Sequence, residues 1–210
     1  MLLKPHILRL IYSVIMRWIL RWIIGVKWEK ASFLLNENQF IIIANHNSHL
    51  DTITLLASIP SKILPKVKPV ASADYFGKTP FRAKLSSYFI NALLISRSEG
   101  SNSIRQMKKT LDEGYSLILY PEGTRGNPEE EQELKPGIAL LLSLCPHVKY
   151  VPAHLTGMGK ALPKGDKLLL PYESSLTYGK PRLIESNDKK EILKQIEEDF
   201  KRLKAIELKN

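Results

Sequence analysis

Residues 39–51 have the sequence QFIIIANHNSHLD, in which an apolar run is followed at once by polar and ionisable residues. The run is short and rich in isoleucine, which predicts a strand that is buried on both faces. The segment 52–59 is mostly apolar and ends before Pro60, which predicts a helix. His46 and Asp51 therefore lie where a strand leads into a helix. Open α/β sheets bind their ligands at such strand ends.

His46 and Asp51 have two interpretations, one catalytic and one structural. On one continuous helix, residues five apart diverge by about 140°, but a turn over 45–49 would return the carboxylate to the imidazole. A base that is oriented by a carboxylate is what proton abstraction needs. Alternatively, Ser48 and Asp51 fit a capping box in which aspartate replaces the usual glutamate. This segment alone leaves both interpretations open.

Composition bounds the class of protein. A chain of 210 residues, 44% apolar and 25% charged, is long enough for one globular domain with a hydrophobic core. The single cysteine, Cys145, lies in an apolar run, which excludes a disulfide framework within the chain and predicts a small buried side chain. The net charge of +10 implies an anionic partner, such as nucleic acid, a membrane surface or a phosphorylated substrate.

The first 30 residues hold half of this excess, because they contain six lysines and arginines and one glutamate, a balance of +5. At helical spacing the segment has one narrow polar stripe amid apolar residues that include Trp18 and Trp22. The stripe consists of His6, Arg9, Ser13, Arg17 and Arg21. Arginine and tryptophan together are typical of helices that lie in the bilayer interface, where arginine reaches lipid phosphates. We therefore predict that residues 1–30 form an amphipathic interfacial segment.

Three other interpretations of residues 1–30 compete with this one. A spanning helix needs about 20 apolar residues, and the longest run without a charge or histidine extends only from Leu10 to Met16. A cleaved secretory signal is disfavoured because arginines interrupt the apolar region and no small-residue cleavage site follows. A buried core helix remains the open alternative, although such a helix seldom carries three arginines on one face.

Beyond residue 60 the chain alternates predicted strands and helices. Strands are expected near residue 70 and at 93–96, 115–120 and 149–155, and helices at 101–111, 138–144 and 188–209. This alternation predicts a single α/β domain over residues 31–210, with a central mostly parallel or mixed sheet that is flanked by helices. An acidic run at 129–133 is expected to be a solvated loop.

Two of the predicted strands lead into basic residues. Arg97 follows the strand at 93–96, and the loop 121–126, PEGTRG, follows the next strand. In this loop proline and glycine shape the backbone, a hydroxyl and the Arg125 guanidinium offer donors, and Glu122 can pair with that arginine. Such a loop is suited to binding phosphate. A surface turn closed by an ion pair is the competing interpretation.

In their order along the chain, these segments resemble the glycerolipid acyltransferases, the family of 1-acylglycerol-3-phosphate acyltransferases and their relatives. His46 and Asp51 match the first family block, a histidine and an aspartate separated by four residues. Lys135 matches the basic residue that follows the third block, and 151–152 match the fourth. The third block itself, Glu-Gly-Thr-Arg, is matched by Glu122, Gly123, Thr124 and Arg125.

Three positions depart from the family pattern. In the second block, Arg97 is preceded by Asn91 or Ala92 where a glycine is expected. Gly126 stands where the third block often has serine, and 72–73 take the place of a lysine that many relatives carry. The missing lysine makes the acceptor less certain than the type of reaction.

The resemblance implies an enzyme that moves a fatty acyl group from acyl-CoA or acyl carrier protein to a hydroxyl of a lysophospholipid. The favoured acceptor is 1-acylglycerol-3-phosphate, which would give phosphatidic acid. We expect His46 to take the hydroxyl proton and Asp51 to orient the imidazole. The expected substrate-binding residues are Arg97, Glu122, Gly123, Thr124, Arg125 and Lys135. No cofactor, no metal and no nucleic acid is expected. The expected location is the lipid surface on the cytoplasmic face of a membrane.

Two alternatives remain for the function. An enzyme of the same kind could acylate another lysolipid, such as a lyso-aminolipid. A non-enzymatic basic protein that coats membranes or nucleic acid would explain the charge and the N-terminal segment equally well. It would not explain why His46, Asp51, Glu122 and Arg125 all follow predicted strands.

Overall fold

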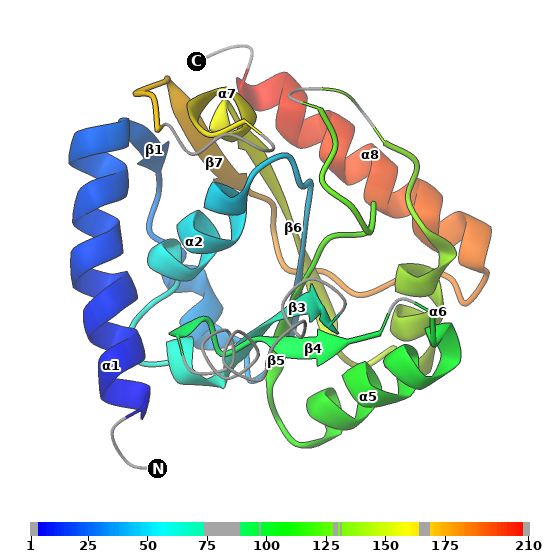
Figure 1. Ribbon diagram of the computed structural model, residues 1–210. Coiled ribbons are helices and arrows are strands. Elements are labelled where there is room, and N and C mark those ends of the chain that lie inside the picture. Colours follow the sequence, from blue (N-terminus) through cyan, green and yellow to red (C-terminus); the bar gives the residue numbers. More distant parts are fainter. Residues whose placement is uncertain are drawn as a thin grey trace.

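The computed structural model describes residues 4–73, 89–96, 98–127, 130, 132–163 and 169–207. They form an α/β domain around a seven-stranded sheet of order β1-β7-β6-β2-β5-β3-β4 (Figure 1). The strands are β1 Val26–Trp28, β2 Phe40–Ala44, β3 Val67–Ser72, β4 Leu93–Ile95, β5 Ser116–Leu119, β6 Lys149–Thr156 and β7 Ser174–Tyr178. The sheet is mixed, because β7 runs antiparallel to β6 while the other neighbouring pairs are parallel. The predicted fold class is confirmed.

Helices cover both faces of this sheet (Figure 1). The N-terminal helical segment, α2 and α7 pack into one hydrophobic cluster, and α5, α6 and α8 pack into a second. The α-helices are α1 Lys4–Leu10, α2 His49–Ser58, α5 Gly100–Asp112, α6 Pro136–Leu144, α7 Met158–Ala161 and α8 Lys189–Glu207. Shorter 3-10 or π-helical elements are η1 Ile11–Met16, η2 Ile19–Ile24, η3 Ser32–Asn36 and η4 Leu64–Lys66.

β2 lies at the centre of the sheet and contributes to both clusters. It pairs in parallel with β5 on one side and β6 on the other. Alternate side chains of a strand point to opposite faces, so Phe40 and Ile42 join the cluster around α2 while Ile41 and Ile43 join the cluster around α6. This two-sided burial explains why the strand is apolar at each position. The predicted strand and its burial are confirmed.

α2 begins at His49, earlier than the predicted start at residue 52. Ser48 is extended at the N-cap and its hydroxyl accepts a hydrogen bond from the Leu50 N–H at 3.2 Å. In return the Asp51 carboxylate accepts the Ser48 N–H at 2.8 Å. The capping box is therefore confirmed, and it draws the polar residues before 52 into the first turn of the helix.

Two arginines of the polar stripe, Arg9 and Arg17, bind the protein, whereas His6 and Arg21 are exposed. Arg17 donates through Nη2 and Nε to the Ala57 carbonyl at 2.6 and 3.0 Å, and Arg9 donates to the Ser61 carbonyl at 3.0 Å. The last carbonyls of a helix have no partners within it and carry partial negative charge, so they attract cations. Arg9 and Arg17 thus bind carbonyls at and beyond the end of α2. A contact of these arginines with lipid phosphates stays a prediction.

The opposite sides of the N-terminal segment differ in burial. Leu8, Tyr12, Leu20 and Ile24 join the core, as the core-helix alternative expected. Trp18 and Trp22 are 58% and 77% exposed, and they belong to an outer apolar face. The members of this outer face are Leu10, Val14, Ile15, Trp18, Trp22 and Ile23. The segment thus packs on the domain and still presents an apolar surface to its surroundings.

Two local features follow from the backbone. Asn91 has a φ of 57°, a left-handed conformation that glycine adopts most readily and asparagine next. Its side chain donates to the carbonyls of Pro65 and Val67 at 3.1 and 3.0 Å. Asn91, one of the two residues that stand where a glycine was expected, therefore has a backbone conformation that glycine favours. Cys145 is buried, as predicted.

Candidate active site

The imidazole of His46 and the carboxylate of Asp51 are in direct contact. Nδ1 of His46 lies 2.9 Å from Oδ2 of Asp51, which also accepts the N–H groups of Asn47 and Ser48 at 2.7 and 2.8 Å. Asp51 is 1% exposed and His46 is 18% exposed. The catalytic and the structural interpretation thus describe the same carboxylate, which caps α2 and orients the imidazole. A carboxylate that accepts from Nδ1–H leaves Nε2 as the basic nitrogen.

Tyr120 supports the other side of the imidazole. The rings of His46 and Tyr120 stack with centroids 4.0 Å apart and planes 16° apart. The Tyr120 hydroxyl is in turn 2.7 Å from Oγ1 of Thr52 on α2. Sequence reasoning missed this support, although Tyr120 stands two residues before the third family block.

Glu122 connects the loop after β5 to the loop after β2. Its Oε2 accepts the His46 N–H at 3.1 Å and an amide N–H of Gln132 at 2.8 Å. The Gly126 N–H donates to the His46 carbonyl at 3.0 Å. The carboxyl ends of the parallel strands β2 and β5 meet at one edge of the sheet. The loop after β5 can therefore bind the main chain of His46, although Glu122 is 76 residues further along the chain.

The Glu122 side chain is only 6% exposed. Its pKa is raised to about 7, chiefly by burial and also by the nearby charge of Asp51. The hydrogen bonds from His46 and Gln132 act in the opposite direction, because they stabilise the ionised form. Glu122 was expected to bind substrate, and in the structure its carboxylate accepts hydrogen bonds from within the chain.

Gly123 and Lys135 shape the loop between β5 and α6. Gly123 has a φ of 75°, which side chains other than glycine rarely tolerate. A Cβ there would be 3.7 Å from Cγ of Lys135, an ordinary contact, so the glycine is needed for its conformation and not for space. The Lys135 N–H donates to the Pro121 carbonyl at 2.8 Å. The exposed Lys135 side chain therefore lies beside the loop, at the N-cap of α6.

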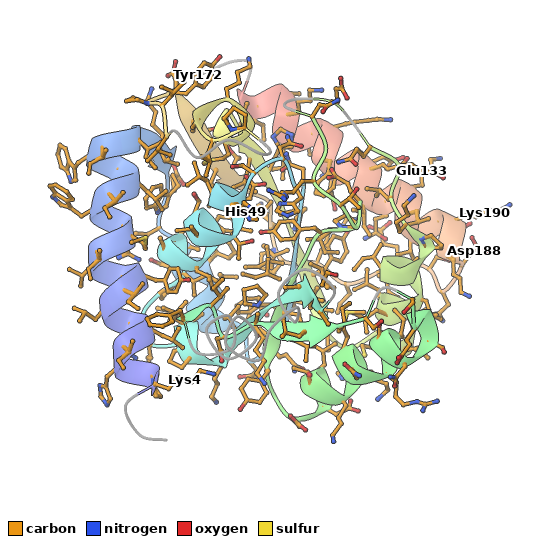
Figure 2. The ribbon with its side chains drawn as sticks, viewed as in Figure 1. Lys4, His49, Glu133, Tyr172, Asp188 and Lys190 are labelled. Atoms are coloured by element: carbon orange, nitrogen blue, oxygen red, sulfur yellow. The ribbon has the colours of Figure 1, made fainter. Side chains whose placement is uncertain are left out.

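The remaining predicted residues lie around this edge or outside the described ranges. Thr124 is exposed, and Arg125 is half-buried. The charge of Arg125 acts on His49, which lies at the start of α2 (Figure 2). Burial lowers the pKa of His49, and the charges of Arg125 and His46 lower it further. Arg97 lies outside the described residues, as does part of the acidic run. Within the described part of the chain, no group of three or more His, Cys, Asp or Glu side chains is arranged to hold a metal ion.

Asn45 and Ser48 fasten the loop after β2 to the far side of the site. Asn45 donates to the Leu155 carbonyl at 2.8 Å and accepts the Leu155 N–H at 2.7 Å, which extends the pairing of β2 with β6 by a side chain. The Ser48 hydroxyl donates to the Leu162 carbonyl at 2.9 Å. The loop that carries His46 is therefore held from both neighbouring strands.

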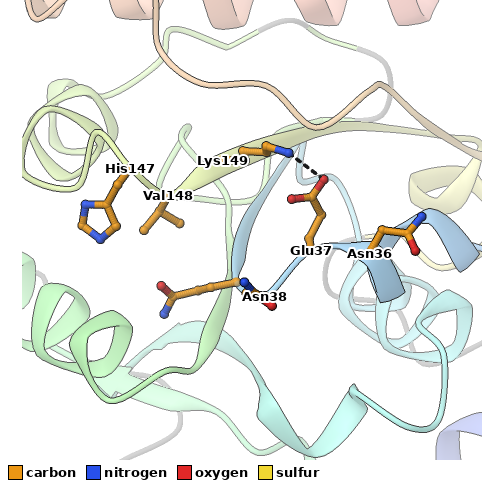
Figure 3. A pocket seen from close by; sticks show the side chains of 7 residues that line it. Asn36, Glu37, Asn38, His147, Val148 and Lys149 are labelled. Atoms are coloured by element: carbon orange, nitrogen blue, oxygen red, sulfur yellow. Dashed lines mark hydrogen bonds and ion pairs between the residues drawn. The ribbon is translucent and has the colours of Figure 1, made fainter.

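A cavity of about 460 Å³ lies away from this site (Figure 3). It is lined by Asn36, Glu37, Asn38, Gln39, His147, Val148 and Lys149. These residues border the amino ends of β2 and β6, whereas His46 follows the carboxyl end of β2. Lys149 and Glu37 pair across this cavity at 2.9 Å. We therefore assign the reactive residues to the opposite edge of the sheet.

Comparison with known proteins agrees with this geometry. The chain is 28% identical over 177 residues to a 1-acyl-sn-glycerol-3-phosphate acyltransferase of Limnanthes alba. The aligned region covers 81% of this chain and 60% of the relative. It is 28% identical over 137 residues to a putative 1-acyl-sn-glycerol-3-phosphate acyltransferase of Caenorhabditis elegans, which covers 62% of this chain and 50% of that protein. The chain thus spans only about half to three fifths of these relatives.

The fold is also that of a known acyltransferase. The crystal structure of the 1-acyl-sn-glycerophosphate acyltransferase PlsC from Thermotoga maritima superposes with a TM-score of 0.71 at 23% identity, over 88% of this chain and 72% of that one. The family model described as Acyltransferase matches residues 25–155, more than half of the chain. That match includes both strand-end loops described above, and the chain belongs to the acyltransferase family.

Proposed function

We propose that this protein transfers a fatty acyl group from a thioester to the free hydroxyl of a lysophospholipid, with 1-acylglycerol-3-phosphate as acceptor and phosphatidic acid as product. The observation that carries the proposal is the 2.9 Å contact between His46 and Asp51 at the edge where Arg125 and Lys135 also lie. Relatives named for this acceptor support the choice of substrate. Acylation of another lysolipid is the alternative.

The chemistry requires a base, and Nε2 of His46 has the position for it. Nε2 takes the proton of the acceptor hydroxyl while the hydroxyl oxygen attacks the thioester carbonyl carbon. The tetrahedral intermediate then expels the thiolate, which receives the proton from the imidazolium. Asp51 holds Nδ1–H throughout and stabilises the positive ring. Cys145 is not the nucleophile, because it is buried in the core near α5 and burial raises its pKa.

The acceptor phosphate would be held by cations on the loops beside His46. Arg125 and Lys135 supply positive charge, and the exposed Thr124 supplies a hydroxyl. Arg97 is proposed as a further contact, because it follows β4 in the sequence. Arginine binds phosphate oxygens through paired N–H groups, which orients the headgroup as well as neutralising it.

We further propose that the outer apolar face of the N-terminal segment contacts the lipid surface. Exposed tryptophans are suited to the membrane interface, and a contiguous apolar face on a protein of this charge favours a lipid partner. Among the helices of the described ranges, none is both long and apolar enough to cross a bilayer. Acyl-CoA and acyl carrier protein are donors of the cytoplasm, so the contact is proposed for the cytoplasmic face.

An acyl-transfer assay with purified protein tests this function. Acyl-CoA and acyl carrier protein thioesters would each be offered with 1-acylglycerol-3-phosphate, lysophosphatidylethanolamine and a lyso-aminolipid. We expect transfer to 1-acylglycerol-3-phosphate to be fastest. Turnover with none of these acceptors, together with normal binding to vesicles, would instead favour the non-enzymatic basic protein.

A further inference from the structure

Gln132 lies in the acidic run that follows the third family block, and it contacts that block at three points. Its Nε2 donates to Oε2 of Glu122 at 2.8 Å and to the Thr124 carbonyl at 3.4 Å. Its Oε1 accepts from the Thr124 hydroxyl at 3.5 Å. Gln132 is half-buried, whereas Glu130 and Glu133 beside it are exposed. One residue of a run that was expected to be a solvated loop thus packs onto the site.

Gly126 provides the space for this side chain. A Cβ at position 126 would lie 2.3 Å from Nε2 of Gln132, 2.8 Å from Cδ and 3.3 Å from Cγ, and these are its three nearest atoms. The first of these distances is shorter than real Cβ contacts. The serine that the family often has here would therefore displace Gln132. The departure at Gly126 and the presence of Gln132 are two parts of one arrangement.

This arrangement reaches His46 at two points. Oε2 of Glu122 accepts from Gln132 and from the His46 N–H, and the Gly126 N–H donates to the His46 carbonyl. Movement of the Glu122 carboxylate would therefore free the His46 N–H and loosen the peptide that carries the imidazole. We propose that Gln132 is a positioning residue for His46, that it acts by holding the Glu122 carboxylate, and that Gly126 is small in order to admit it. This proposal rests on the proposed acyl transfer.

The electrostatics of Glu122 give the arrangement a measurable signature. Its pKa is raised to about 7, chiefly by burial, and the Gln132 hydrogen bond lowers it. The nearby charge that acts on Glu122 is that of Asp51 on α2. Arg125 in the same loop, Lys135 at the N-cap of α6 and the ring of His46 are the other ionisable groups of this edge. Removal of the Gln132 amide leaves these groups in place. The pKa of Glu122 should therefore rise further, so that the carboxyl is protonated at neutral pH and holds the His46 N–H less well.

A double-mutant cycle tests the proposal with Gln132→Ala, Gly126→Ala and the combined variant. Gln132→Ala should lower the rate at pH 7 on the order of 10-fold, the typical worth of a hydrogen bond to a charged group, and its rate should recover as pH rises to 9. Gly126→Ala should cost a similar factor when Gln132 is present and little when residue 132 is already alanine. Alanine is compatible with the backbone at position 126, because Gly126 is not among the glycines with positive φ.

A control and a second measurement complete the test. Asn127→Ala removes the 2.8 Å hydrogen bond to Glu130 in the same loop, without contact to Glu122, and should leave the rate unchanged. A carboxyl ¹³C NMR titration, with Glu122→Gln to assign the signal, should show a higher pKa for Glu122 in Gln132→Ala. Equal losses from Gly126→Ala in both backgrounds, or an unchanged Glu122 titration, would overturn the role of Gln132. Absence of acyl transfer in the unmodified protein would overturn the proposed function instead.

Discussion

Basic side chains have opposite surroundings in two regions of this molecule. In the N-terminal segment, Arg9 and Arg17 turn toward the protein and bind main-chain carbonyls, while the outer face is apolar. At the carboxyl edge of β2 and β5, Arg125 and Lys135 are at least partly exposed, while the carboxylate of Asp51 is buried. The first region uses its charge for packing and offers apolar surface. The second uses buried carboxylates for positioning and offers charge.

The difference shows what a charge pattern can predict. A polar stripe on a helix establishes that two faces differ, but it does not establish which face meets the solvent. In the N-terminal segment, Arg17 of the polar stripe donates hydrogen bonds to the Ala57 carbonyl in the last turn of α2. At strand ends the direction is fixed by topology, since neighbouring parallel strands deliver their following loops to one edge.

The largest expected effect lies at the charged edge. His46→Ala removes the proposed base, so the rate should fall by about two to four powers of ten. Thermal unfolding is measured beside the rate, because the imidazole is only 18% exposed and stacks on Tyr120. His147→Ala, at the remote cavity, is the matched control and should retain full activity. Steady-state rates and circular dichroism melts measure both quantities. Near-normal turnover in His46→Ala would refute the mechanism.

A second prediction concerns the pH dependence of folding. The folded pKa of Glu122 is about 7 and its ordinary value is 4.5, so the folded state binds this proton more tightly. The contribution of Glu122 to the free energy of unfolding is therefore full below pH 4.5 and is lost as pH rises through 7, by about 2–3 kcal/mol. Glu122→Gln lacks this titration.

Chemical denaturation at pH 4.5 and pH 8 measures the effect. The stability of Glu122→Gln relative to the unmodified protein should increase between these two values by about the same 2–3 kcal/mol. A constant difference would show that Glu122 is accessible to water in solution.

The third prediction concerns the phosphate. Arg125→Ala should raise the KM for 1-acylglycerol-3-phosphate by about 30-fold, which corresponds to about 2 kcal/mol for a charge-assisted contact, and should leave the KM for the thioester almost unchanged. Arg105→Ala, on the exposed side of α5, controls for the loss of one positive charge. Equal increases for both substrates would indicate collapse of the loop and not loss of a phosphate contact.

The smallest effects separate the two faces of the N-terminal segment. Trp22→Ser should weaken sedimentation with anionic vesicles by about 10-fold, from about 1.5 kcal/mol of apolar burial, with no change in thermal unfolding. Arg17→Met should lower the free energy of unfolding by about 1–2 kcal/mol, because it removes the hydrogen bonds to the Ala57 carbonyl. It should leave sedimentation with vesicles unchanged. If Trp22→Ser destabilised folding and Arg17→Met released the protein from vesicles, the assignment of the two faces would be inverted.

The sequence predicted the parts of the molecule that depend on local pattern. The buried strand before Asn45 and the alternation of strands and helices follow from periodicity. The contact of His46 with Asp51 was predicted only on the condition that a turn returns the carboxylate to the imidazole. β1 and β7 were not predicted, because their pairing with each other joins residues about 150 positions apart. The stacking of Tyr120 on His46 was missed for the same reason, since ring contacts across two strands leave no mark in either segment.

α2 is held at both ends by the two regions contrasted above. Its first turn is capped by the carboxylate that orients His46, and its last carbonyls are bound by Arg17 of the segment proposed to meet the lipid. Ten residues of α-helix span about 15 Å. α2 therefore connects the segment proposed to contact the membrane with the residue proposed as the base. If the outer tryptophans insert into the bilayer interface, the depth of their insertion would set the distance of His46 from the membrane surface. Acceptor lipids would then be selected by how far their hydroxyl lies from the bilayer as well as by their headgroup.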